Sequence, residues 1–215
     1  MQIPFFSSYL TDPSLQLKLA LLMIFALILS GCAIAPKPEK GLSEAQRQSL
    51  WQVHQKQLRG LGHWNLKGRM GLRVPGDSGT LSLEWQQNKE SYLIYLDGPL
   101  GQSVAKISGQ PGFVALEASG KRYQDRNPEK LLFELTGWDL PVSLLRYWVM
   151  GLPSPESKAI TQLNNRGYPE LIVQKGWQVE YLQYKDFSGV TLPVRIKIRQ
   201  DGVQATLFAR SWQLK

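Results

Sequence analysis

Apolar and polar residues alternate along most of the chain after residue 63. In 64–74 the apolar side chains share one parity and the polar ones the other, and 81–86 and 192–199 repeat this pattern. Successive side chains of a β-strand point to opposite faces, so each run indicates a strand with one apolar and one solvated face. Asp201-Gly202 is a typical hairpin turn. Further strands are expected at 92–96, 103–108, 113–118, 121–124, 171–174, 177–181 and 203–214.

Three segments follow helical spacing instead. The first covers 43–61, where Ser43 and Gln46 match a capping box. The second begins at Asn127, a suitable N-cap followed by proline, and the third spans 142–150. The apolar residues expected on one side of the first helix are Leu50, Trp51, Val53, Leu58 and Leu61.

Together these elements predict a mainly β protein, a curled antiparallel sheet with about three helices laid across its apolar concave face. A sheet with one apolar face needs such a cover or closure. The periodicity fits a concave side filled by the chain's own residues as well as one left open as a cavity. We found no internal repeat, and the length suits a single domain over 42–215.

The first 31 residues have the pattern of a secretory signal peptide. Lys18 precedes eleven apolar residues, Leu19 to Leu29, which are too few to span a bilayer, where about 20 are needed. The run ends in Leu29-Ser30-Gly31-Cys32, and Cys32 is the only cysteine. This resembles a bacterial lipobox. The resemblance implies cleavage before Cys32, a diacylglycerol on its thiol and an acyl chain on its new amine, which together exceed the two signals needed for stable anchoring.

Residues 32–41 then form a lipidated N-terminus and a proline-containing tether. Ala33 follows the cysteine, and by resemblance to bacterial sorting rules the lack of Asp at this place implies delivery to the outer membrane. The net charge is +8, and removing 1–31 takes away one lysine and one aspartate, so the charge stays the same. An exported protein meets little nucleic acid, so anionic lipid or an acidic protein is the favoured partner. A basic surface without a partner is the alternative.

The sequence offers no conventional catalytic or metal-binding set. His54 and His63 are the only histidines, and Cys32 is committed to the lipobox, so a zinc site is not expected. There is no nucleophile elbow, no phosphate-binding glycine-rich loop and no defensible pair of carboxylates. We expect neither an enzyme nor a cofactor, and any transfer would run on differences in affinity.

Several short motifs occur in order along the mature chain. They are Trp64 with Lys67-Gly68-Arg69-Met70, Leu83-Glu84-Trp85-Gln86, Gly98-Pro99-Leu100-Gly101, Leu140-Pro141-Val142, Leu145 through Pro153, Gly176-Trp177-Gln178-Val179 with Tyr181, Leu192-Pro193 and Ser211-Trp212. Each motif alone is weak, but the ordered set behind a lipobox is specific. It resembles the LolB family of outer-membrane lipoprotein receptors, within the LolA/LolB lipoprotein-localisation family.

The resemblance implies an incomplete, open antiparallel β-barrel whose mouth is covered by helices. Receptors of this family are anchored in the outer membrane and face the periplasm. They accept lipoproteins from the periplasmic carrier LolA, bind the acyl chains in an apolar cavity and insert them into the outer membrane. The implied partners are therefore a LolA-like carrier, cargo lipoproteins and outer-membrane phospholipid, without nucleic acid. We expect the receptor to be a monomer.

An apolar shelter is a physical requirement of such transfer, because acyl chains in water cost about 0.8 kcal/mol per CH₂. Aromatic side chains would give that shelter wide, rigid walls. Ordinary core packing is the competing interpretation for every candidate. The candidates for the cavity are Trp64, Leu83, Trp85, Tyr95, Leu145, Trp148, Trp177, Val179 and Tyr181.

Leu100 is the sharpest candidate outside the cavity. Pro99 and Gly101 hold it in a turn between two strands, where an apolar side chain would face water. In the family, a protruding loop at this motif carries an apolar residue used for membrane insertion of the cargo, and the motif match assigns that role to Leu100. A leucine folded back onto the sheet is the alternative.

Two other functions stay open at this point. One is a structural or envelope-assembly lipoprotein with a filled β core, and the other is a lipid-modifying enzyme that uses the same cavity. The enzyme would need a nucleophile and base that the two histidines are poorly placed to supply. Basic residues expected on solvated faces are candidates for docking the carrier: Arg69, Arg73, Arg195, Lys197 and Arg199.

Overall fold

The computed structural model describes residues 41–136 and 141–215, which belong to one compact unit beginning at Gly41. The signal peptide, Cys32, the tether up to residue 40 and Leu140 lie outside the described residues. The described residues form eleven strands and three helices. The strands are β1 (His63–Val74), β2 (Asp77–Asn88), β3 (Ser91–Asp97), β4 (Ser103–Gln110), β5 (Phe113–Ala118), β6 (Lys121–Asp125), β7 (Ala159–Leu163), β8 (Pro169–Gln174), β9 (Trp177–Phe187), β10 (Val190–Gln200) and β11 (Val203–Leu214).

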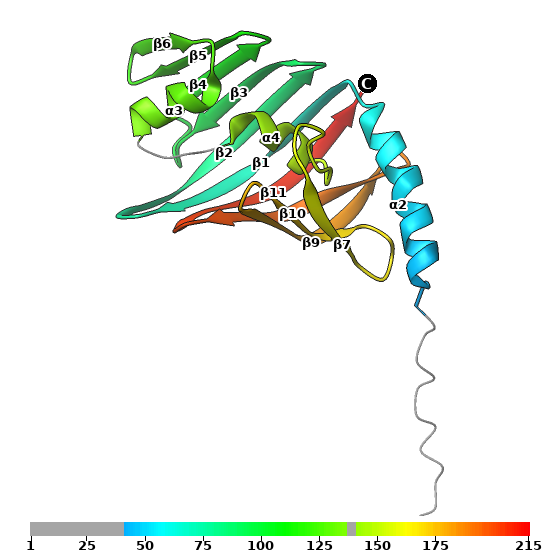
Figure 1. The fold of residues 1–215 in the computed structure, drawn as a ribbon. Helices are drawn as coiled ribbons and strands as arrows, with labels where there is room; N and C mark the ends of the chain where they lie inside the picture. Colours follow the sequence, from blue (N-terminus) through cyan, green and yellow to red (C-terminus); the bar gives the residue numbers. More distant parts are fainter. Residues whose placement is uncertain (1–40, 137–140) are drawn as a thin grey trace, which may run out of the picture. The chain divides into compact units, whose positions relative to one another are not determined.

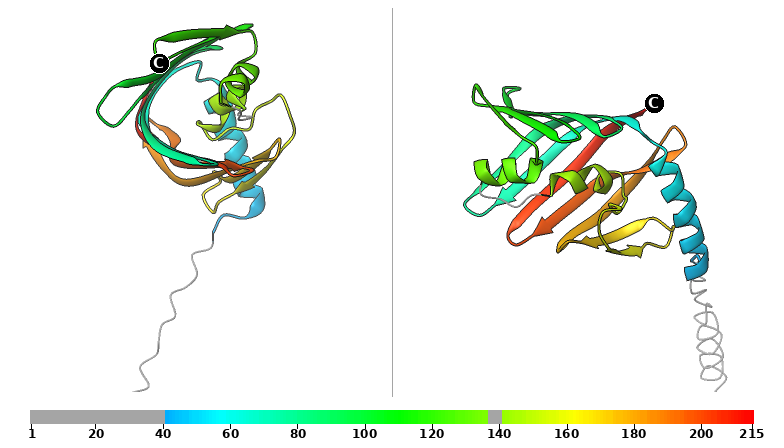
Figure 2. Two further views of the ribbon diagram at one scale, coloured as in Figure 1. Left: turned by 90° about the vertical axis from the view of Figure 1, so that its left-hand side faces the viewer. Right: turned by 45° about the horizontal axis from the view of Figure 1, so that its top comes forward.

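All eleven strands belong to one antiparallel sheet with the order β6-β5-β4-β3-β2-β1-β11-β10-β9-β8-β7. Most neighbours are consecutive hairpins, whereas the central pair joins β1 to β11 from opposite ends of the unit (Figure 1). The sheet curls strongly, but β6 and β7 remain its two edges, so it is an open barrel (Figure 2). The predicted fold class is confirmed.

The concave face holds the main core. Alternate residues of β1, β2, β9 and β10 are buried there, as the period of two predicts. At its centre the Trp64 ring lies 5.4 Å from that of Trp85 and 5.2 Å from that of Trp212. These large side chains fill the space that curvature creates between neighbouring strands and the helices above them.

Helices α3 (Pro128–Thr136) and α4 (Val142–Trp148) lie over the concave face, as the left view of Figure 2 shows. Helix α2 (Glu44–Arg59) runs beside the turns that join β7 to β8 and β9 to β10. The Gln57 side-chain amide donates to the Gly189 carbonyl there, and the His54 ring packs against Tyr168. The capping box that opens α2 is present, as predicted.

One expectation from the sequence was wrong, and one strand was missed. The buried side of α2 is formed by Trp51, His54 and Leu58, whereas Leu50 and Val53 are exposed. Successive helical residues turn by about 100°, which puts Val53 well away from the stripe that Trp51 and Leu58 define. Strand β7 was not predicted. It is a short edge strand in which half-buried and exposed residues alternate, and neither of its faces is strongly apolar.

Candidate acyl-chain site and exposed loop

Eight of the nine predicted cavity residues lie on the concave side, but most of them are packed rather than lining open space. Leu145 on α4 is half-buried, and the other seven are almost fully buried in one apolar cluster together with α4 and the end of α2. These seven are Trp64, Leu83, Trp85, Trp148, Trp177, Val179 and Tyr181. The sequence therefore located the apolar face correctly, and in this structure its centre is filled.

Tyr95 was assigned to the wrong face. It pairs with Glu84 and Lys106 in the sheet and lies on the outer side, where it lines a cleft with Val104 and Lys106. The residues 92–96 are apolar on both parities, so their alternation does not identify the inner side. The register shows that Ile94 is the buried residue of this segment.

The C-terminal end of α4 is fixed by a buried polar network. Trp148 Nε1 donates to Gln174 Oε1 at 2.9 Å, and Gln174 Nε2 donates to the Ser154 and Ser157 carbonyls at 2.8 Å each. The Tyr181 hydroxyl donates to the Trp148 carbonyl at 2.9 Å. Burial raises the pKa of Tyr181 well above its ordinary value, so the hydroxyl stays a neutral donor. This end of the helix is therefore held as firmly as the core itself.

Among the described residues, the N-terminal end of α4 makes fewer hydrogen bonds to other elements. Pro141 provides no side-chain cap, and instead Glu129 of α3 accepts a hydrogen bond from the Ser143 amide at 2.9 Å. Helix α3 buries Leu131 in a small separate cluster with Val114 and Leu116. The two helices thus form one cover, which we call the α3–α4 cover (Pro128–Thr136 and Val142–Trp148). Its buried hydrogen bonds to the rest of the fold lie at its Trp148 end, and Leu144 and Leu131 hold it by apolar packing.

Two clefts flank α4 on the concave side. One, of about 230 Å³, lies toward α3, and the other, of about 300 Å³, lies toward the end of α2. Both have apolar and aromatic walls with a few charged residues at their edges. The first is lined in part by Trp85, Tyr92, Phe113, Val142 and Arg146. The second is lined in part by Leu58, Leu61, Trp64, Met150, Leu152 and Arg146.

Tyr92 and Arg146 shape these clefts. The Tyr92 ring lies over Gly109, where an added Cβ would come within 2.2 Å of the ring, and burial raises the pKa of Tyr92 to about 12. Arg146 stands between the clefts with its guanidinium 4.7 Å from the Tyr147 ring centroid, and it donates to the Tyr147 hydroxyl at 2.8 Å. Its Nε has no hydrogen-bond partner among the described residues. Arg146 therefore brings a positive charge to the edge of both clefts, with its Nε buried.

Leu100 lies in the turn between β3 and β4 and is 91% exposed. The turn is held by its backbone: the Gly98 amide donates to the Gln102 carbonyl at 2.8 Å, and the Gly101 amide donates to the Gly98 carbonyl at 3.0 Å. The Leu100 amide donates to Gln102 Oε1 at 3.1 Å. Gly101 has a φ of +78°, a conformation that favours glycine. The hydrogen-bonded turn therefore presents the leucine to solvent and does not fold it back onto the sheet.

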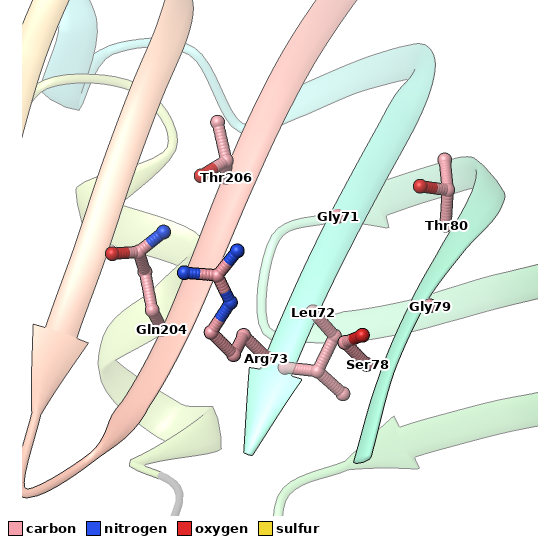
Figure 3. A pocket seen from close by; sticks show the side chains of 8 residues that line it. All are labelled: Gly71, Leu72, Arg73, Ser78, Gly79, Thr80, Gln204 and Thr206. Carbon is pink, nitrogen blue, oxygen red and sulfur yellow. The ribbon is translucent and has the colours of Figure 1, made fainter.

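The outer face of the sheet also carries hollows with mostly polar walls. One, of about 290 Å³, lies where Gly71 leaves space between Thr80 and Thr206, with Arg73 lying toward Gln204 of β11 (Figure 3). Hydroxyl, amide and guanidinium groups make this an unsuitable place for an acyl chain. In the described ranges no group of three or more His, Cys, Asp and Glu side chains could hold a metal ion.

Residues 62–212 match the family model of the outer membrane lipoprotein LolB. The outer-membrane lipoprotein LolB of Pseudomonas fluorescens is 41% identical over 189 residues, which cover 87% of this chain and 92% of that protein. The LolB protein of Pseudomonas aeruginosa is 41% identical over 202 residues, covering 93% and 97%. The chain belongs to the LolB family.

Solved structures agree with the fold of this LolB-family protein. A LolA superfamily protein from Nitrosomonas europaea superposes with a TM-score of 0.51 at 7% identity, over 78% of this chain and 93% of that one. A DUF1329 family protein from Desulfovibrio piger gives 0.52 at 9% identity, over 79% and 92%. Membership of the LolB family makes the chain a lipid-anchored lipoprotein of the outer membrane that faces the periplasm. None of the helices in the described ranges has the length and apolarity to cross a membrane.

Sequence reasoning missed the residues that hold the cover of this LolB-family protein. Gln174 stands at the end of a predicted strand and Glu129 in the first turn of a predicted helix. Nothing in the sequence around either residue indicates which group it binds. Only the tertiary fold brings Gln174 to Trp148 and Glu129 to Ser143.

Proposed function

We propose that this LolB-family protein accepts lipoproteins from a LolA-like carrier, shelters their acyl chains between the concave face and the α3–α4 cover, and releases them into the outer membrane. The observation that carries the proposal is the apolar concave face beneath a helical cover, with a cleft on either side of α4. No nucleotide or cofactor takes part, and the direction of transfer follows from differences in affinity.

The two clefts are too small to hold several acyl chains unless the α3–α4 cover moves. At about 230 and 300 Å³ they fall at or below the lower end of ordinary ligand pockets, about 300–1,000 Å³. Several acyl chains therefore require the cover to shift away from the sheet. The Trp148–Gln174 network makes that end the pivot. The Leu131 cluster is the contact with the sheet that opens, and the Glu129–Ser143 hydrogen bond keeps the two helices together as they move.

Leu100 completes the proposed cycle by entering the membrane during release. Its exposed side chain gains up to about 2 kcal/mol on leaving water, and the rigid turn avoids the entropic cost of ordering a loose loop. Cys32 carries the acyl anchor that keeps the domain at the membrane. Basic residues on the outer face of β1 and β10, such as Arg69 and Arg195, are the candidates for docking the carrier.

A disulfide across the cover tests the proposal. Cysteines at Leu131 and Leu116, which pack together, would join α3 to the sheet when oxidised. The mature lipoprotein has no other free thiol, since Cys32 is acylated in the proposal. We expect the oxidised double variant to lose uptake from a loaded carrier and to regain it on reduction.

The Leu131→Cys single variant, treated with the same oxidant, is the matched control. The same experiment decides against a structural lipoprotein with a filled core, an alternative favoured by the dense packing around Trp64 and Trp148. Such a protein would take up no acyl chains in either redox state, and uptake unaffected by the disulfide would refute the moving cover.

A further inference from the structure

A polar cleft with apolar rims lies beside the Leu100 turn. Register places the turn between β5 and β6 at the same end of the sheet as Leu100, because Ala105 near the start of β4 pairs with Ala118, which pairs with Lys121. The cleft, of about 490 Å³, lies between these two turns. Tyr95 and Val104 form its apolar part.

The charged groups of this cleft are mostly basic. Lys106, Lys121 and Arg122 face a single carboxylate, Glu117, which lies 3.4 Å from Lys106 Nζ and 3.4 Å from Arg122 Nη1. Lys121 has no ion pair among the residues that the structure describes, and Lys121 and Arg122 are exposed. The nearest further acidic residues by register are Asp97, which pairs with Ser103, and Glu84, which pairs with Tyr95 and forms an ion pair with Lys67. The cleft therefore has cationic groups left over for an anion.

The depth of the cleft matches that of lipid headgroups. The last β3–β4 pair is Asp97 with Ser103, and Lys121 stands two residues further back, about 7 Å at 3.4 Å per residue. Leu100 reaches beyond the last pair in the opposite direction. The polar layer on each side of a bilayer is roughly 5–8 Å thick. If the strands stand along the membrane normal with Leu100 at the hydrocarbon, Lys121 and Arg122 lie at the outer side of this layer, where their long side chains can reach the phosphates.

We propose that this cleft is a binding site for the phosphate groups of anionic phospholipids, and that it docks the Leu100 turn on the membrane. The inference rests on the proposed insertion of Leu100, and it adds the lipid class that the receptor engages. A lone leucine supplies little apolar area, so cations are needed to hold the loop at the surface. Each Lys or Arg near an anionic bilayer strengthens binding about fivefold.

Vesicle flotation tests the proposal, using the mature chain from residue 33 without its acyl anchor. The probes are phosphatidylethanolamine vesicles with and without phosphatidylglycerol. We expect the Lys121→Gln/Arg122→Gln variant to bind anionic vesicles about 25-fold more weakly and neutral vesicles unchanged. Lys185→Gln/Lys215→Gln, exposed at the opposite end of the sheet, removes the same charge and is expected to keep binding.

Three results would overturn the headgroup site: equal losses in the two double variants, no loss in the first, or displacement by inorganic phosphate at the ionic strength of a chloride control. The last would indicate a site for free phosphate. Leu100→Ser separates the proposals, because it is expected to weaken binding to both vesicle types and to stop delivery. If Leu100→Ser delivers normally, the proposed function fails. If only the Lys121/Arg122 result fails, the proposed function stands.

Discussion

Gln174 is the residue whose removal should most directly reveal how α4 is held. Its side chain is 1% exposed and accepts hydrogen bonds from Trp148 Nε1 and the Ser154 amide, while donating to the Ser154 and Ser157 carbonyls. Gln174→Ala leaves two buried donors without an acceptor. Each unsatisfied group costs about 1–3 kcal/mol, and the space vacated by the side chain adds to this.

We therefore expect Gln174→Ala to lower the free energy of unfolding by about 3–5 kcal/mol, a large part of a typical total of about 5–15 kcal/mol. Urea titration followed by tryptophan fluorescence measures this loss, because Trp148 itself reports on the site. Gln178→Ala is the matched control: that glutamine accepts from Arg199 on the exposed outer face, so its loss should stay within about 0.5 kcal/mol. A Gln174→Ala loss below about 1 kcal/mol would refute the view that this network pins the helix.

Three further predictions follow from the same geometry. Leu100→Glu should leave folding and acyl uptake intact but reduce delivery to liposomes at least about 100-fold, since a charge replaces an apolar group at the bilayer; normal delivery would contradict the assigned role. Burial lowers the pKa of His54, so the unfolded chain binds the extra proton; the free energy of unfolding should fall as the pH drops below about 6.5, and His54→Gln should reduce that slope in urea titrations at several pH values. Gly109→Ala should clash with the Tyr92 ring and cost about 1–3 kcal/mol in thermal unfolding, whereas Gly79→Ala, which meets open space, should be tolerated.

Most of the strands could be predicted from the sequence because one of their two faces is solvated and polar. Leu192 and Ile196 are buried while Arg195 between them is exposed, so the alternation alone fixes which side faces the core. The exposure of Leu100 could also be predicted from the sequence, since proline and glycine define its turn without contacts from distant residues.

The features that could not be predicted depend on contacts that exist only in the assembled sheet. Tyr95 and Ile94 are both apolar, and pairing with neighbouring strands decides which of them is buried. Whether the concave side is filled depends on where α4 settles, and Trp148 reaches its position through Gln174, which is 26 residues further along the chain. Periodicity describes one element at a time, so it cannot report such contacts.

The central pairing of β1 with β11 has a consequence for how the domain is made. Its rungs, such as Leu66 with Trp212, join residues from opposite ends of the folded unit, so the middle of the sheet is the last ladder that synthesis and export can supply. Until β11 is available the chain can form only two separate half-sheets, β1 to β6 and β7 to β10, whose apolar faces are not joined. Because β11 lies between β1 and β10, its loss would divide the sheet at its centre and would not merely shorten one edge. Folding of the whole domain therefore depends on its last strand.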